Sequence, residues 1–249
     1  MSRISAVFKN KKALIVFIMA GDPSLEKTEK LVYEIEKSGA DIIELGIPFS
    51  DSIADGPTIQ AAAIRALNKN VLAVDSIKLA KKIRKRSNIP LIFMTSYNIL
   101  VSYGVEKFMK DSASAGVDGL IIPDLPLEEA DSIKKNGLDL IFLVAPNSSD
   151  ERIKLAAKIS TGFIYVVSIA GITGARKDLQ LDIQGIITKL RRQTKTPIAI
   201  GFGISNPKQA AEASKIADGV IVGSAVIDII SKKLKQTGKF VSSLKRAIS

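Results

Sequence analysis

The stretch from Asp41 to Gln60, "DIIELGIPFSDSIADGPTIQ", contains the repeating unit of the fold: an apolar run, a polar loop and the start of a helix. The run "DIIEL" is short, β-branched and nearly continuous, which is typical of a strand buried on both faces of a parallel sheet. Gly56-Pro57 breaks the chain, and Pro is favoured at the first position of a helix. A surface loop explains Asp51 and Asp55, whereas Glu44 lies inside the apolar run and needs another explanation.

Seven more runs of this kind recur along the chain, and helical patterns lie between them. Strand–helix alternation through eight units in 249 residues predicts a single (β/α)8 TIM barrel domain over residues 1–249. An open doubly wound sheet is the alternative. The other expected strands cover residues 13–20, 90–94, 119–122, 140–144, 163–167, 197–201 and 219–222.

Helices are expected where apolar residues recur at helical spacing. The second unit has room for an extra helix, since residues 58–67 and 74–86 both have helical patterns. We also expect a helix at the N-terminus. Extra material after the second strand indicates an elaborated loop over the active face. The remaining expected helices cover residues 24–38, 105–115, 127–135, 149–159, 179–192 and 207–216.

Composition excludes several classes of function. The chain has no Cys, His or Trp, so disulfides, the usual zinc sites, Cys nucleophiles and imidazole catalysis are all ruled out. No apolar run approaches the length of a membrane span, and no signal peptide is apparent, so we expect a soluble protein of the cytoplasm, or of the organelle stroma if the source has plastids. The net charge of +11 comes from scattered Lys and Arg. Solvated helix faces explain it better than nucleic-acid binding does, since only 5% of residues are aromatic.

Glycine-rich loops after the last two strands indicate a phosphate site. "GFGIS" (201–205) and "VGSAV" (222–226) each lead into a helix, where backbone N–H groups and the helix dipole attract anions. The loops after strands seven and eight are the usual phosphate site of this fold. Tight turns without a ligand are the simpler alternative. The loop "SIAGITGARKD" (168–178) is long enough to close over a ligand, or is a plain flexible loop.

Three polar side chains are candidates for the chemistry. Glu44, next to last on its strand, would emerge inside the barrel mouth, where burial raises the pKa of a carboxyl toward the working pH of a general acid or base. A salt-bridged structural Glu is the alternative. Asp55 precedes Gly56-Pro57 and reads locally as a turn or capping residue. Tyr165, on the sixth strand, is either a core aromatic or a polar group in the pocket.

The residues of the expected strands exclude several further classes of reaction. A Schiff-base aldolase needs a Lys on a barrel strand, and none of the eight runs contains one. A zinc aldolase and a triose isomerase both need His. What remains is a phosphorylated substrate and carboxylate acid–base catalysis without metal or covalent intermediate.

Long motifs now show a specific likeness. "IELGIPFSDSIADGPTIQ" closely resembles the signature of the tryptophan synthase alpha subunits. The family's motif "FIMAGDPS" precedes it, and "GVDGLIIPDLP", "YVVSIAGITGAR", "GFGIS" and "ADGVIVGSAVI" follow it in the family's order. The resemblance implies a lyase of tryptophan biosynthesis that cleaves indole-3-glycerol phosphate to indole and glyceraldehyde 3-phosphate. A barrel retained mainly to activate a partner is the alternative.

The resemblance also assigns residues. Glu44 would be the acid–base group, Asp55 would accept a hydrogen bond from the indole N–H, and Tyr165 would line the site. Thr173 would help to position the Asp from the closing loop. The phosphate would be held by Gly174, Gly203, Gly223 and Ser224, and the indole pocket would be walled by Phe17, Ile59, Ile121 and Phe202.

A partner follows from the same resemblance: the tryptophan synthase beta subunit, in an αββα heterotetramer. Pyridoxal phosphate would belong to beta, and we expect no cofactor or metal in this chain. The surface toward beta would contain Pro48, Phe49, Asp51 and Asp124. Three residues depart from the family pattern and bear on loop contacts and pocket width: Ser52, Ser96 and Ile169.

Overall fold

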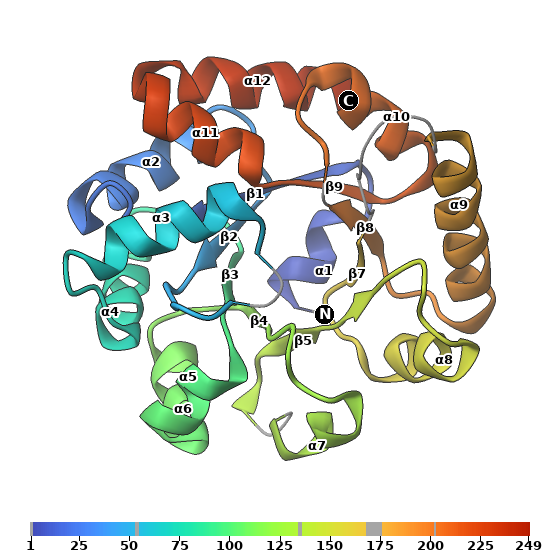
Figure 1. Ribbon diagram of the computed structural model, residues 1–249, viewed down its shortest axis with the longest axis horizontal. Coiled ribbons are helices and arrows are strands. Elements are labelled where there is room, and N and C mark those ends of the chain that lie inside the picture. The colour runs from blue at the N-terminus through green and yellow to red at the C-terminus, as the bar shows by residue number, and fades with distance from the viewer. Residues whose placement is uncertain (1, 53–54, 134–135, 168–175, 202) are drawn as a thin grey trace.

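The strands of the computed structural model form a parallel barrel with helices around it (Figure 1). The structure describes residues 2–52, 55–133, 136–167, 176–201 and 203–249. Within these ranges nine strands follow the order β5-β4-β3-β2-β1-β9-β8-β7-β6. Their bounds are β1 Ala13–Met19, β2 Ile42–Gly46, β3 Leu91–Met94, β4 Gly119–Ile121, β5 Asp139–Ile141, β6 Leu143–Val144, β7 Ile164–Val167, β8 Ile198–Gly201 and β9 Gly219–Val222.

The two end strands of this order are neighbours in the chain. β5 and β6 are separated by Phe142 alone, so one continuous segment occupies a single position in the barrel and closes it. The predicted TIM barrel is confirmed. The expected fifth strand is divided in two, because its first half pairs with β4 and its second half pairs with β7.

Helices surround the barrel, with α3 and α4 both between β2 and β3, as the extra-helix prediction requires. The helix α5 was not predicted; it is a short helix that Ser96 caps through the N–H of Asn98. None of the helices in the described ranges has the length and apolar character needed to cross a lipid bilayer. The bounds are α1 Arg3–Val7, α2 Leu25–Lys37, α3 Pro57–Leu67, α4 Ala73–Ile83, α5 Tyr97–Tyr103, α6 Val105–Ser114, η1 Leu127–Glu129, α7 Ala130–Ile133, α8 Asp150–Ile159, α9 Arg176–Gln193, α10 Pro207–Ile216, α11 Ser224–Lys233, η3 Leu234–Gln236 and α12 Thr237–Ile248.

The predicted N-terminal helix, α1, closes one end of the barrel. Ile4 is fully buried and packs against Gly119 at the start of β4 and Gly162 just before β7. A Cβ on either glycine would approach the Ile4 side chain to 2.8–3.0 Å. The Phe8 ring lies 5.8 Å from the Phe163 ring. The open end of the barrel is therefore the one at which the strands finish.

Alternation along the strands divides the core into two layers. On β1, Leu14, Val16 and Ile18 pack against the helices, whereas Ile15 and Phe17 point into the barrel. Glu44 is paired in register with Phe17 on one side and Ile92 on the other, both of which are inward-facing. The pleat therefore directs the Glu44 carboxyl into the barrel near the ends of the strands.

Aspartates follow a common pattern at the closed end. Asp41, Asp118 and Asp218 each precede a strand, and each accepts a backbone N–H near the start of a neighbouring strand. The donor is the first residue of the strand for Asp118 and Asp218 and the second for Asp41. Asp41 also pairs with Lys11 and Lys245, Asp118 with Arg84 and Arg3, and Asp218 with Arg191. These side chains replace the backbone partner that a strand lacks where the sheet begins.

Candidate active site

A cavity of about 100 Å³ lies at the open end of the barrel, where the strands finish. This is the end at which (β/α)8 enzymes carry their active sites. The structure brings eight of the predicted site residues together around it, from both ends of the sequence. They are Phe17, Glu44, Asp55, Ile59, Tyr165, Gly203, Gly223 and Ser224.

Glu44 is the most buried acid of the cavity, with 1% of its surface exposed. Its Oε2 has no hydrogen-bond partner among the described residues. Burial, and secondarily the charge of Asp55, raises the pKa of Glu44 from its usual 4.5 to about 8. At neutral pH the carboxyl is therefore mostly protonated, and it can both give and take a proton near that pH.

Asp55 lies directly before α3, which begins with Gly56 as N-cap and Pro57 at its first position. The Gln60 Nε2 donates to the Asp55 carbonyl at 2.9 Å and fixes the backbone there. The Asp55 side chain does not serve as a cap, and its Oδ1 is buried without a partner in the described structure. Burial raises the pKa of Asp55, while the Ser52 hydroxyl acts in the opposite direction. The structure thus favours a site carboxylate over the local turn interpretation.

Tyr165 lies on β7 with 5% of its surface exposed. Burial, followed by the nearby charges of Glu44 and Asp55, raises the pKa of Tyr165 well above its ordinary value, so the phenol stays protonated. Gly201 at the end of β8 leaves room for it, because a Cβ there would lie 2.2 Å from the Tyr165 hydroxyl oxygen. The tyrosine is therefore both a core aromatic and a polar group of the pocket.

The opposite side of the cavity is built for an anion. Gly223 is the N-cap of α11, and Ser224 is its first residue. The first N–H groups of a helix have no partner inside the helix and carry its positive dipole end. Gly203 has φ +74°, a backbone conformation that favours glycine. The cavity has no Lys or Arg among its described lining residues, so helix termini and hydroxyls are the donors available to a phosphate.

Apolar side chains complete the cavity, and some were not predicted. Met94 and Ile221 line it beside Phe17 and Ile59. In the sequence both look like ordinary strand residues. The signal that could have identified them is that each faces into the barrel at or next to the end of its strand. Ile121 is fully buried in the same inner layer but is not part of the cavity wall. The predicted Thr173, Gly174 and Phe202, with most of the loop 168–178, lie outside the described residues.

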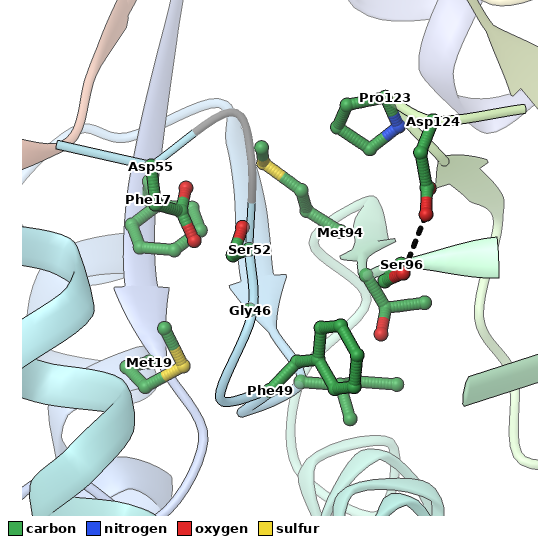
Figure 2. A pocket seen from close by; sticks show the side chains of 12 residues that line it. Phe17, Met19, Gly46, Phe49, Ser52, Asp55, Met94, Ser96, Pro123 and Asp124 are labelled. Carbon is green, nitrogen blue, oxygen red and sulfur yellow. Dashed lines mark hydrogen bonds between the residues drawn. The ribbon is translucent and has the colours of Figure 1, made fainter. Parts of the chain in front are cut away.

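Two of the residues predicted to face a partner, Phe49 and Asp124, line a pocket beside the cavity. Phe49 is half-buried and Asp51 exposed, whereas Pro48 is buried within this chain. Asp124 is turned inward: its Oδ2 accepts from the Ser96 hydroxyl at 2.5 Å (Figure 2), and its Oδ1 accepts from the Tyr97 N–H at 2.8 Å. These two bonds connect the end of β3 to the loop after β4. Of the residues that depart from the family pattern, Ile169 lies outside the described residues.

Comparison with known proteins agrees with the geometry. The sequence model of the family described as tryptophan synthase alpha chain matches residues 4–248. A tryptophan synthase alpha chain from Thermoanaerobacter sp. (strain X514) is 49% identical, with both chains covered in full. One from Geotalea uraniireducens is 46% identical over all of this chain and 98% of the relative.

Solved structures give the same result. Tryptophan synthase subunit alpha from Legionella pneumophila str. Paris superposes with a TM-score of 0.90 at 37% identity, covering all of this chain and 98% of that one. A chain of the aminoacrylate-bound tryptophan synthase from M. tuberculosis gives a TM-score of 0.90 at 32% identity, with both chains covered in full. The protein described above therefore belongs to the tryptophan synthase alpha chain family.

Proposed function

We propose that Glu44, Asp55 and Tyr165 carry out the alpha reaction of tryptophan synthase in this chain. The family's alpha chain is a carbon–carbon lyase of tryptophan biosynthesis that cleaves indole-3-glycerol phosphate to indole and glyceraldehyde 3-phosphate. The observation that carries the assignment is the pair of buried carboxyls, each with one oxygen that has no partner in the described structure, across the cavity from a helix N-terminus.

Glu44 acts first as an acid. Its proton goes to indole C3, which makes the ring an indolenine cation and an electron sink. The bond between C3 and the glycerol chain then breaks, and its electron pair returns to the ring. The hydroxyl proton of the glycerol carbon passes to the Glu44 carboxylate as the aldehyde forms. The two proton transfers cancel, so no water, metal or cofactor is consumed.

Asp55 stabilises the charge that develops during this step. The positive charge on the ring is shared with N1, and a carboxylate accepting the N1–H bond favours that cation over the neutral substrate. Tyr165 supplies a phenol that stays neutral beside Glu44. Gly203, Gly223 and Ser224 hold the phosphate and so orient the substrate. We assign Phe17 and Ile59 to the indole wall.

Two substitutions at the acid end test these roles. We expect Glu44→Gln to lower the rate of indole formation by about two to four orders of magnitude, the contribution typical of general acid–base catalysis. Asp55→Asn keeps the shape and should lower the rate by a smaller factor. Indole release is measured with the chain alone and after adding a beta subunit. Near-normal turnover by Glu44→Gln would contradict the mechanism, and indole formation that is absent in the wild type would support a role as activator only.

A beta subunit is the proposed partner, in an αββα assembly, with pyridoxal phosphate bound to beta and indole passed between the two. The similarity to a chain of the M. tuberculosis tryptophan synthase supports this proposal. Phe49, which lines a pocket beside the cavity, and the exposed Asp51 are our candidates for the contact surface. That the protein acts in the cytoplasm stays a prediction. Light scattering of the mixed subunits tests the stoichiometry, and a mixture that elutes as separate subunits would contradict it.

A further inference from the structure

A second pocket adjoins the main cavity on the side of Asp55 (Figure 2). We call it the side pocket. Phe17, Asp55 and Met94 line both spaces, so at most one layer of side chains separates them. Met94 is a flexible side chain that can move aside for a ligand. Beyond this shared boundary the side pocket is bordered by Gly46, Thr95 and Ser96.

The side pocket has room for a substituent but not for a second substrate. Its volume is about 20 Å³, room for one water-sized group, against about 100 Å³ for the main cavity. Gly46 lets the Phe17 ring pack closely at the boundary, because a Cβ there would lie 2.6 Å from Cζ of that ring. Ser96 contributes a small side chain to the pocket wall. Replacing Ser96 with a large residue would fill the space.

Some polar groups of the side pocket have hydrogen-bond partners within the protein and others have none among the described residues. The Ser96 hydroxyl is already bonded to Asp124. Thr95 is 5% exposed, and its Oγ1 is buried with no hydrogen-bond partner among the described residues. Asp55 Oδ1, at the boundary between the two spaces, is also buried with no hydrogen-bond partner among the described residues. A buried hydroxyl without a partner is unfavourable, and a polar group of a ligand is the kind of atom that relieves it.

The proposed reaction sets the orientation of the ring, and this inference rests on that proposed function. Indole C3 faces Glu44, which lines only the main cavity, and N1 faces Asp55, which lines both spaces. The ring edge next to N1 carries C7, whereas C4 lies on the side of C3. The side pocket therefore lies nearest to the C7 edge of the indole.

We propose that the side pocket accepts a small polar substituent at the C7 edge of the indole, with Thr95 and Ser96 as specificity-determining residues. The chain would then process hydroxyl-substituted indoleglycerol phosphates as well as the unsubstituted substrate. Thr95 supplies a hydrogen bond to the substituent, and the small Ser96 side chain leaves space for it.

The reverse reaction provides the test, because substituted indoles can be supplied directly. Indole C3 forms a bond to the aldehyde carbon of glyceraldehyde 3-phosphate, C3 loses its proton and the aldehyde oxygen gains one. The quantity measured is kcat/KM for 7-hydroxyindole divided by that for indole, with 4-hydroxyindole as the comparison for the other ring edge. We expect the ratio for 7-hydroxyindole to exceed that for 4-hydroxyindole by about tenfold or more in the wild type.

Two variants then examine the pocket itself. Thr95→Val keeps the shape and removes the hydroxyl, and should lower the 7-hydroxyindole ratio by about three- to tenfold, the effect of one hydrogen bond. Ser96→Leu fills the space and should lower the ratio further, chiefly through KM. Ser114→Leu, the same exchange at an exposed position of α6, is the matched control and should leave the ratio unchanged.

The outcomes separate this inference from the proposed function. If the wild type does not condense indole itself, the proposed function fails. If it condenses indole but prefers 4-hydroxyindole to 7-hydroxyindole, or if neither pocket variant changes the ratio, the side-pocket proposal alone is overturned. Because Ser96 also caps α5, circular dichroism of Ser96→Leu checks the fold, and Thr95→Val gives a result that does not depend on that cap.

Discussion

Carboxyls lie at both ends of the barrel, and most of them differ in how they are partnered. Asp139, at the start of β5, is an exception at the closed end, because its Oδ2 is buried without a partner in the described structure. At the closed end Asp118 accepts a backbone N–H from Leu91 and pairs with Arg84 at 2.5 Å, and Asp41 accepts the N–H of Leu14 and pairs with two lysines. At the open end Glu44 and Asp55 each keep one buried oxygen without a partner in the described structure.

The difference supports our proposal that the closed end serves stability and the open end serves chemistry. Burial raises the pKa of Asp118 as well, but there the N–H of Leu91 and the charge of Arg84 oppose the shift and the carboxylate holds strands together. At Glu44 no such partner opposes the effect of burial on the pKa. The pKa of Glu44 is raised to about 8, close to the pH at which proton transfer to and from the group is efficient. Substitutions at the two ends should therefore have opposite effects on folding and on turnover.

The largest effect on stability is expected at the closed end. Asp118→Ala leaves the Arg84 guanidinium buried without its carboxylate, and should lower the free energy of unfolding by about 3–5 kcal/mol. Turnover per folded molecule should stay within about twofold. Urea unfolding and the indole assay measure the two quantities. Asp111→Ala, which breaks the exposed Lys107–Asp111 pair on α6, is the control and should change stability much less. Equal losses in the two variants would remove the distinction that we draw for the closed end.

Glu44→Gln should act in the opposite direction on folding. The folded-state pKa of Glu44 is raised, so the stability associated with its proton is complete below about 4.5 and is lost as pH rises to about 8. Over this window the unfolded chain releases the proton first. The glutamine variant has no such proton, so its stability advantage over the wild type should grow by several kcal/mol between pH 5 and pH 8 and then level off. Urea unfolding at several pH values checks this, and a constant difference would show that burial does not raise the pKa of Glu44.

The smallest effect on catalysis is expected at the proposed phosphate site of the open end, where Ser224 lies. Ser224→Ala removes one hydroxyl from a site that also has helix N–H groups, so KM for indole-3-glycerol phosphate should rise about three- to tenfold, with little change in kcat. Steady-state kinetics separates the two. A fall in kcat at constant KM would place Ser224 in the chemical step and not in phosphate binding.

Much of the architecture was predictable because it depends on local patterns. Apolar runs gave the barrel positions, and Pro57 correctly marked the start of α3. The division of the fifth strand was not predictable, because it arises when one segment pairs with two different neighbours. α5 was missed because a seven-residue helix that Ser96 starts and Gly104 ends has little periodicity of its own.

The candidate site was predictable only in part. Glu44 could be identified from its own segment, since an acid in a buried strand is unusual. Asp55 could not, because the side chains that bury it come from distant parts of the chain. Met94 has the residue type of a core side chain, and only its height in the barrel places it at the cavity. Thr95 becomes notable only when the lack of a hydrogen-bond partner is visible.

The central claim is that Glu44 is protonated near neutral pH because it is buried, lacks a partner for one oxygen and lies near Asp55. Isotope-edited infrared spectroscopy, with Glu44→Gln subtracted from the wild type, follows the carboxyl stretch of this residue through a pH titration. The structure predicts a midpoint at about pH 8 and a lower midpoint in Asp55→Asn, because the second cause of the raised pKa is then absent. A midpoint near 4.5 in the wild type would contradict the account.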